Sequence, residues 1–121
     1  MLFAIHSSPR GAWTVVAVTG ELELATAPRL RQEVVSLVGD GRVNIVLDLE
    51  AVDFIDSIGL GVVVSALKRV RSRDGQLVVA GAGPRVRSLF QLTRLDEIIE
   101  LHESVDAALE VPIGRPSRRD P

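Results

Sequence analysis

The segment Asp56-Ser57-Ile58-Gly59-Leu60-Gly61 contains the residues whose types and spacing could do chemistry. Its serine follows an apolar stretch, residues 43–47, that is typical of a buried strand, and it precedes a helical pattern that runs to about Arg73. The first turn of a helix has unpaired backbone N–H groups and a partial positive charge, which attract a hydroxyl oxygen or an anion. Ser57 can therefore act as a helix N-cap or as the acceptor of a phosphate, and local physics leaves the two roles equally open.

The residues around Ser57 favour a surface that another protein can approach. A glycine inside a helix costs about 0.8 to 1 kcal/mol relative to alanine, so Gly59 and Gly61 need a compensating benefit, and we expect it to be close approach by a partner. A helical projection places Ile58, Gly61 and Ser65 opposite the apolar side of the helix. The sequence thus predicts an exposed docking surface next to Ser57.

The flanking sequence alternates between strand and helix patterns. Strands are expected at residues 2–7, 13–19, 43–49, 76–80 and 97–101, with a turn at Ser8-Pro9-Arg10-Gly11. Helices are expected after Thr26, Ser57, Gly83 and Ser104, the first of them capped by Thr26. This order predicts a single α/β domain over residues 1–110, with a mixed sheet of four to five strands packed against about four α-helices. Residues 111–121 are rich in Pro, Gly, Arg and Ser, and we expect a disordered tail there.

Composition excludes several classes of function. The 121 residues have a net charge of −2 and no Tyr, which argues against nucleic-acid binding. There is no Cys, and the two histidines lack the spacing of a metal site, so we expect neither a metal nor a cofactor. No stretch has the length of a membrane span and no cationic leader precedes an apolar run, so a cytoplasmic protein without a membrane partner is expected.

A hydrolase is the enzymatic alternative. Ser57 could form a catalytic triad with an aspartate and either His6 or His102. A nucleophile elbow, however, needs a glycine two residues before the serine, and Ile55 stands there. We therefore expect no enzymatic activity and no catalytic residue.

Residues 53–61 closely resemble the phosphorylation motif of the anti-sigma-factor antagonists, which are bacterial STAS-domain proteins. Further segments match in the same order: Gly20-Glu21-Leu22-Glu23, Leu77-Val78-Val79-Ala80-Gly81, and residues 86–99. The resemblance covers the chain up to about Leu109. Two positions depart from the usual motif, because Glu23 replaces an aspartate and Ile58 replaces a small polar residue.

The resemblance implies a partner switch. In such families the unphosphorylated antagonist binds an anti-sigma factor that is also a serine kinase, and a sigma factor is released. The kinase then phosphorylates the motif serine, here Ser57, which ends binding, and a PP2C-type phosphatase restores it. The partner-binding residues implied or predicted here are Glu21, Glu23, Asp56, Ile58, Gly59, Gly61 and Ser65.

A second interpretation keeps the same fold without a phosphoswitch. Fold does not fix function, and a STAS module can also serve as a ligand-binding or accessory subunit of a transport or stress-signalling complex. The sequence leaves open whether the chain forms a homodimer.

Overall fold

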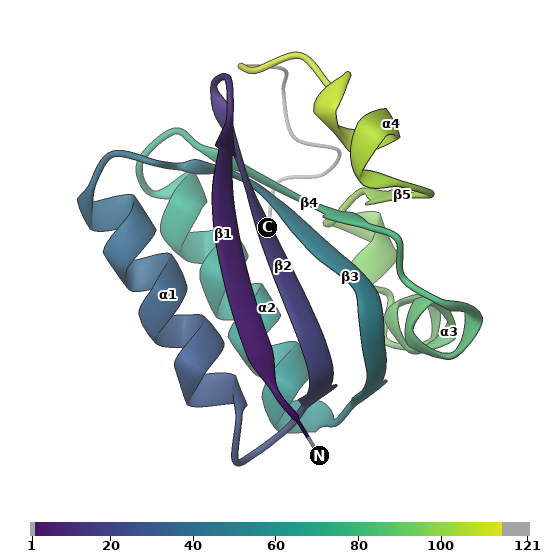
Figure 1. The fold of residues 1–121 in the computed structure, drawn as a ribbon. Helices are drawn as coiled ribbons and strands as arrows, with labels where there is room; N and C mark the ends of the chain where they lie inside the picture. Colours follow the sequence, from purple (N-terminus) through teal and green to yellow (C-terminus); the bar gives the residue numbers. More distant parts are fainter. Residues whose placement is uncertain (1, 115–121) are drawn as a thin grey trace.

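A five-stranded mixed sheet forms the centre of the molecule (Figure 1). The computed structural model describes residues 2–114. The strands lie in the order β1 (Ala4–Arg10), β2 (Trp13–Leu22), β3 (Asn44–Ile55), β4 (Gln76–Ala80) and β5 (Leu101–His102). β1 is antiparallel to β2, and all other neighbours are parallel. The helices are α1 (Ala27–Gly39), α2 (Ser57–Arg71), α3 (Pro84–Leu92) and α4 (Val105–Leu109), with a 3₁₀ turn η1 at Leu95–Glu97. The predicted fold class is confirmed.

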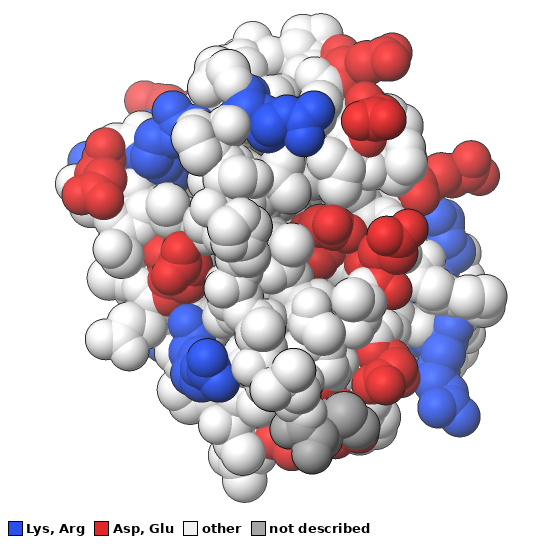
Figure 2. All heavy atoms as spheres, viewed as in Figure 1, with Lys and Arg blue, Asp and Glu red and all other residues white. Residues whose placement is uncertain are grey.

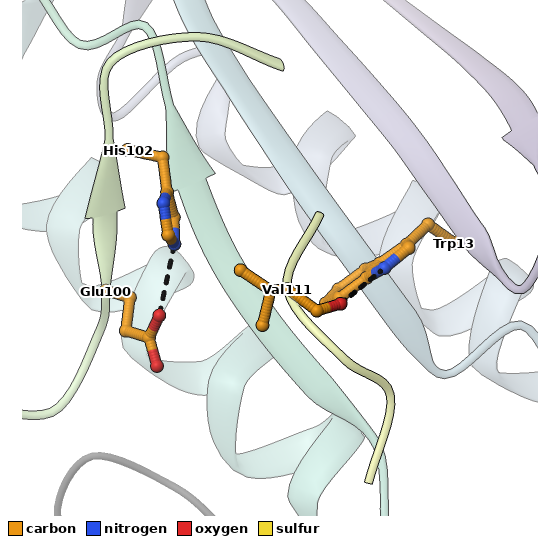
Figure 3. Close-up of polar contacts among 4 residues, drawn as sticks. All are labelled: Trp13, Glu100, His102 and Val111. Carbon is orange, nitrogen blue, oxygen red and sulfur yellow. Dashed lines mark hydrogen bonds and ion pairs between the residues drawn. The ribbon is translucent and has the colours of Figure 1, made fainter. Parts of the chain in front are cut away.

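The two faces of the sheet carry separate apolar cores, as the alternation of side chains along a strand requires. Val16 and Val18 of β2 belong to the larger core, which also contains side chains of α1, α2 and α3. Trp13 and Val15, on the other face, pack in a smaller core with Ala108 of α4. The indole Nε1 of Trp13 donates a hydrogen bond to the carbonyl oxygen of Val111 at 3.3 Å (Figure 3).

The part of the second face that α4 leaves uncovered is acidic. Asp48 is half-buried on β3, and Glu50 and Asp53 are exposed there. Figure 2 shows acidic side chains gathered where β3 crosses this face. Such a surface repels phosphate backbones, so it offers no support for nucleic-acid binding on this side of the sheet.

Several predicted boundaries are wrong. β2 continues to Leu22, beyond the expected end at 19. β3 continues to Ile55, beyond the expected end at 49. The prediction stopped early because bulges in the pairing with β2 break the alternation of burial along the second half of the strand. Pro9 lies within β1 and the turn is Gly11-Ala12, which an edge strand permits because a proline there removes no ladder hydrogen bond. The last strand is only β5, since η1 ends at the first residue of the expected strand at 97–101 and a turn follows it.

The folded domain extends past residue 110. Val111 is buried, and the backbone N–H of Gly114 donates to the side-chain oxygen of Gln76 at 2.6 Å. Two residues of the predicted tail, Val111 and Gly114, therefore contact the domain. The remainder of the predicted tail, residues 115–121, lies outside the described residues.

Asp56, not Ser57, is the N-cap of α2. Asp56 has an extended backbone (φ −98°, ψ −176°), and its Oδ1 accepts a hydrogen bond from the backbone N–H of Gly59 at 2.8 Å. Ser57 is the first helical residue. The N-cap role considered for Ser57 is thus filled by its neighbour.

The two glycines of α2 differ in environment. Gly59 is buried, and a Cβ built on it would lie 2.3 Å from the carbonyl oxygen of Leu22. A Cβ on Gly61 would meet nothing within 4 Å. The expectation that both glycines admit a partner is wrong for Gly59, whose missing side chain admits the chain's own β2 backbone.

We predict that Gly59→Ala lowers the free energy of unfolding by about 1 to 3 kcal/mol, because the new methyl group overlaps a backbone atom that cannot move freely. The control is Gly61→Ala, which should raise stability by up to about 1 kcal/mol, since it only improves helix propensity. Urea unfolding measures both. Equal effects of the two substitutions would contradict the packing of α2 on Leu22.

We predict that Asp56→Ala lowers the free energy of unfolding by about 0.5 to 2 kcal/mol, because it removes the cap of α2. Ser57→Ala should stay within about 0.5 kcal/mol of the parent, as expected for an exposed residue. Thermal and chemical unfolding of the two variants check the assignment. The reverse ranking would make Ser57 the cap.

Candidate functional site

Two segments that are distant in sequence meet beside Ser57. β2 and β3 are parallel, so their last residues, Leu22 and Ile55, lie side by side at one edge of the sheet. The backbone N–H of Asp56 donates to the carbonyl oxygen of Leu22 at 3.2 Å. The structure therefore brings two predicted site residues, Glu21 at the end of β2 and Glu23 in the loop after it, next to the start of α2.

The Asp56 carboxylate joins these two segments directly. While Oδ1 caps α2, Oδ2 accepts a hydrogen bond from the backbone N–H of Leu24 at 3.1 Å. Both carboxylate oxygens are thus engaged within the chain, and the side chain is half-buried. Asp56 was predicted as a partner-binding residue, and its contacts indicate that it positions the surface around Ser57.

Thr26 fixes the loop between β2 and α1 instead of capping α1 as expected. Its hydroxyl donates to the carbonyl oxygen of Glu21 at 2.6 Å and accepts from the backbone N–H of Glu23 at 3.0 Å. The Glu23 carboxylate accepts a hydrogen bond from the backbone N–H of Ala25. An aspartate can make the same bond to the N–H two residues later, as Asp48 does with Glu50, so the structure does not explain the glutamate at position 23.

The exposed surface around Ser57 is partly apolar. Ser57 and Gly61 are exposed, and Ile58 keeps 47% of its surface accessible. Leu24 is 69% exposed, and its backbone is hydrogen-bonded to Asp56. We call Leu24, Ser57, Ile58 and Gly61 the switch face.

Sequence reasoning placed most of the switch face but missed Leu24. The projection of α2 correctly put Ile58 and Gly61 outward, while Ser65 is half-exposed. A signal for Leu24 was available, because an apolar residue in the short loop between a strand and a helix has no layer to pack against. Whether these residues contact a partner stays a prediction.

The geometry rules out a Ser–His triad. The strand registers place His6 and His102 in the same row of the sheet as Asp48. Asp48 precedes Ile55 by seven residues of β3, which corresponds to roughly 20 Å along a strand. Both histidines are therefore far outside hydrogen-bonding distance of Ser57. His102 instead lies 3.1 Å from the Glu100 carboxylate (Figure 3).

Within residues 2–114, no three His, Asp or Glu side chains are grouped so that they could hold a metal ion. None of the helices described there is both long enough and apolar enough to cross a membrane.

Comparisons with known proteins show the family to which this chain is similar. The STAS domain family matches residues 5–108. The anti-sigma-B factor antagonist of Staphylococcus aureus is 31% identical over 102 residues, which cover 84% of this chain and 94% of that protein. The protein of the same name from Listeria monocytogenes is 40% identical over 87 residues, or 71% of this chain and 75% of that protein.

A solved structure extends the likeness to three dimensions. The crystal structure of an anti-sigma factor antagonist from Mycobacterium paratuberculosis superimposes with a TM-score of 0.82 at 30% identity, covering 89% of this chain and 92% of that chain. Sequence and fold thus agree over nearly the whole described domain. The chain belongs to the STAS-domain family of anti-sigma factor antagonists.

Proposed function

We propose that this chain is an anti-sigma factor antagonist controlled by phosphorylation of Ser57. The unphosphorylated form binds an anti-sigma factor that is also a serine kinase, and a sigma factor is released. The kinase transfers the γ-phosphoryl group of ATP to the Ser57 hydroxyl, which ends binding. The observation that carries the proposal is that Ser57 is exposed and is not the helix cap, so its hydroxyl is available for modification.

The charge of the phosphate accounts for the loss of binding. A phosphoserine carries about −2 charge at neutral pH. The Asp56 carboxylate is adjacent, and two unit charges 4 Å apart repel by about 1 kcal/mol even in water and by more in a drier interface. Leu24 and Ile58 flank the serine, so a partner packed on them would exclude water from the phosphate. A desolvated dianion without a paired cation is strongly unfavourable.

The fold tolerates the modification because residues other than Ser57 make the contacts that stabilise this region. Asp56 holds the cap and the neighbouring loop, and Gly59 makes the close contact with β2. The phosphate therefore alters the surface more than the structure beneath it. Reversal would require a phosphatase, which we propose to be of the PP2C type. A cycle that uses ATP and releases a sigma factor is expected in the cytoplasm.

We predict that incubation with ATP and purified candidate anti-sigma kinases from the same genome adds one phosphate to the chain. Ser57→Ala should abolish this addition, whereas Ser65→Ala on the same helix should retain it. Intact-mass and peptide mass spectrometry locate the phosphate. Absence of labelling with every candidate kinase would favour the alternative, a STAS accessory or ligand-binding module without a phosphoswitch.

We predict that Gly61→Arg weakens binding of the kinase at least about tenfold, because the new side chain projects from an open position on the switch face. Gly39→Arg is the matched control. Gly39 is also exposed, with nothing within 4 Å of its Cβ position, but it lies at the last residue of α1. Calorimetry measures both affinities, and circular dichroism checks the fold. Equal affinities of the two variants would exclude Gly61 from the interface.

A further inference from the structure

A small apolar groove lies between the end of β3 and α3. Its volume is about 220 Å³, and its walls include Phe54 and Ile55 from β3 and Arg85, Leu89 and Leu92 from α3. We call it the β3–α3 groove. Phe54 is 44% exposed and Leu92 79% exposed, so a large share of the apolar wall is open to solvent.

The groove follows from the local packing of both elements. Ile55 points into the main core, so its strand neighbour Phe54 must point away from it. α3 buries Val86 and Phe90 in the same core, which leaves Leu92 outside. Two large apolar side chains therefore remain exposed together, and their contact with water is unfavourable by about 25 cal/mol per Å² of apolar surface.

Size and charge define what the groove can hold. A volume of about 220 Å³ is below the roughly 300 to 1,000 Å³ of ordinary small-molecule sites, and it suits a single apolar side chain of a protein partner. Arg85 is exposed at its wall and forms no ion pair with any residue of the described range 2–114. A partner that places a carboxylate beside its apolar side chain would form an ion pair with the guanidinium group of Arg85.

The groove lies close to the switch face. Phe54 and Ser57 are three residues apart, and successive Cα atoms are 3.8 Å apart, so their Cα atoms lie within about 11 Å of each other. A standard protein interface buries about 800 Å² on each partner and extends well beyond this distance. One partner can therefore cover both places at once.

We propose that the β3–α3 groove is a second anchoring site for the anti-sigma kinase, which inserts one apolar side chain and pairs an adjacent carboxylate with Arg85. This inference rests on the proposed function. Ser57 does not line the groove, so the groove contributes equally to binding of the unphosphorylated and the phosphorylated form. A substitution that disrupts the groove should therefore lower the affinity of the kinase for both forms by the same factor.

The test measures the affinity of the kinase that labels Ser57 for Arg85→Glu and Leu92→Ser. Each substitution should weaken binding about tenfold, as expected for an anchor residue at an interface. The matched controls lie on α1: Arg31→Glu makes the same charge change, and Val35→Ser removes an exposed apolar side chain. Both controls should bind like the parent. All four sites are exposed, and circular dichroism verifies that each variant is folded.

Other outcomes separate the two proposals. Unchanged affinity of the groove variants, with Ser57 labelling intact, would overturn the groove and leave the switch standing. Failure of every kinase to label the parent chain would overturn both. Equal weakening by the α1 controls would indicate an effect that does not depend on the groove and would also overturn this proposal. A homodimer in sedimentation experiments that dissociates with Leu92→Ser would show that a second copy occupies the groove instead.

Discussion

The carboxylate of Asp56 is the interaction on which the arrangement of the site depends. One oxygen caps α2 through Gly59, and the other holds the loop after β2 through Leu24. The parallel pairing of Leu22 with Ile55 brings the two segments to the same sheet edge, and the missing side chain of Gly59 lets them touch. Without this bridge, the loop with Leu24 would not be fixed against the exposed residues at the start of α2.

The residues that stabilise the site are not the residue that is modified, and this explains how a chemical change on the surface can leave the domain intact. The structural contacts belong to Asp56 and Gly59, which are half-buried and buried, whereas Ser57 and Ile58 are exposed between them. A charge added at Ser57 therefore acts mainly on whatever covers the switch face. The carboxylate that organises the site also raises the cost of that charge, because it lies next to the modified residue.

Sequence patterns predicted the elements better than the contacts between them. The order of strands and helices and the outward side of α2 follow from periodicity, which the sequence displays directly. The cap could not be assigned, because Asp56 and Ser57 are both good N-cap residues and only the backbone conformation distinguishes them. The role of Gly59 depends on a carbonyl group 37 residues earlier in the chain. The β3–α3 groove could not be predicted from the sequence either, since it is formed by the packing of α3 on β3.

The most direct test of the account is the affinity of one anti-sigma kinase for the unphosphorylated and the phosphorylated form of the chain without any substitution. Calorimetry measures both affinities, with ADP in place of ATP so that the kinase transfers no phosphate during the measurement. The account predicts that phosphorylation of Ser57 weakens binding about a hundredfold or more, because an uncompensated charge in a buried interface costs about 3 to 5 kcal/mol. Equal affinity of the phosphorylated and unphosphorylated forms would contradict it.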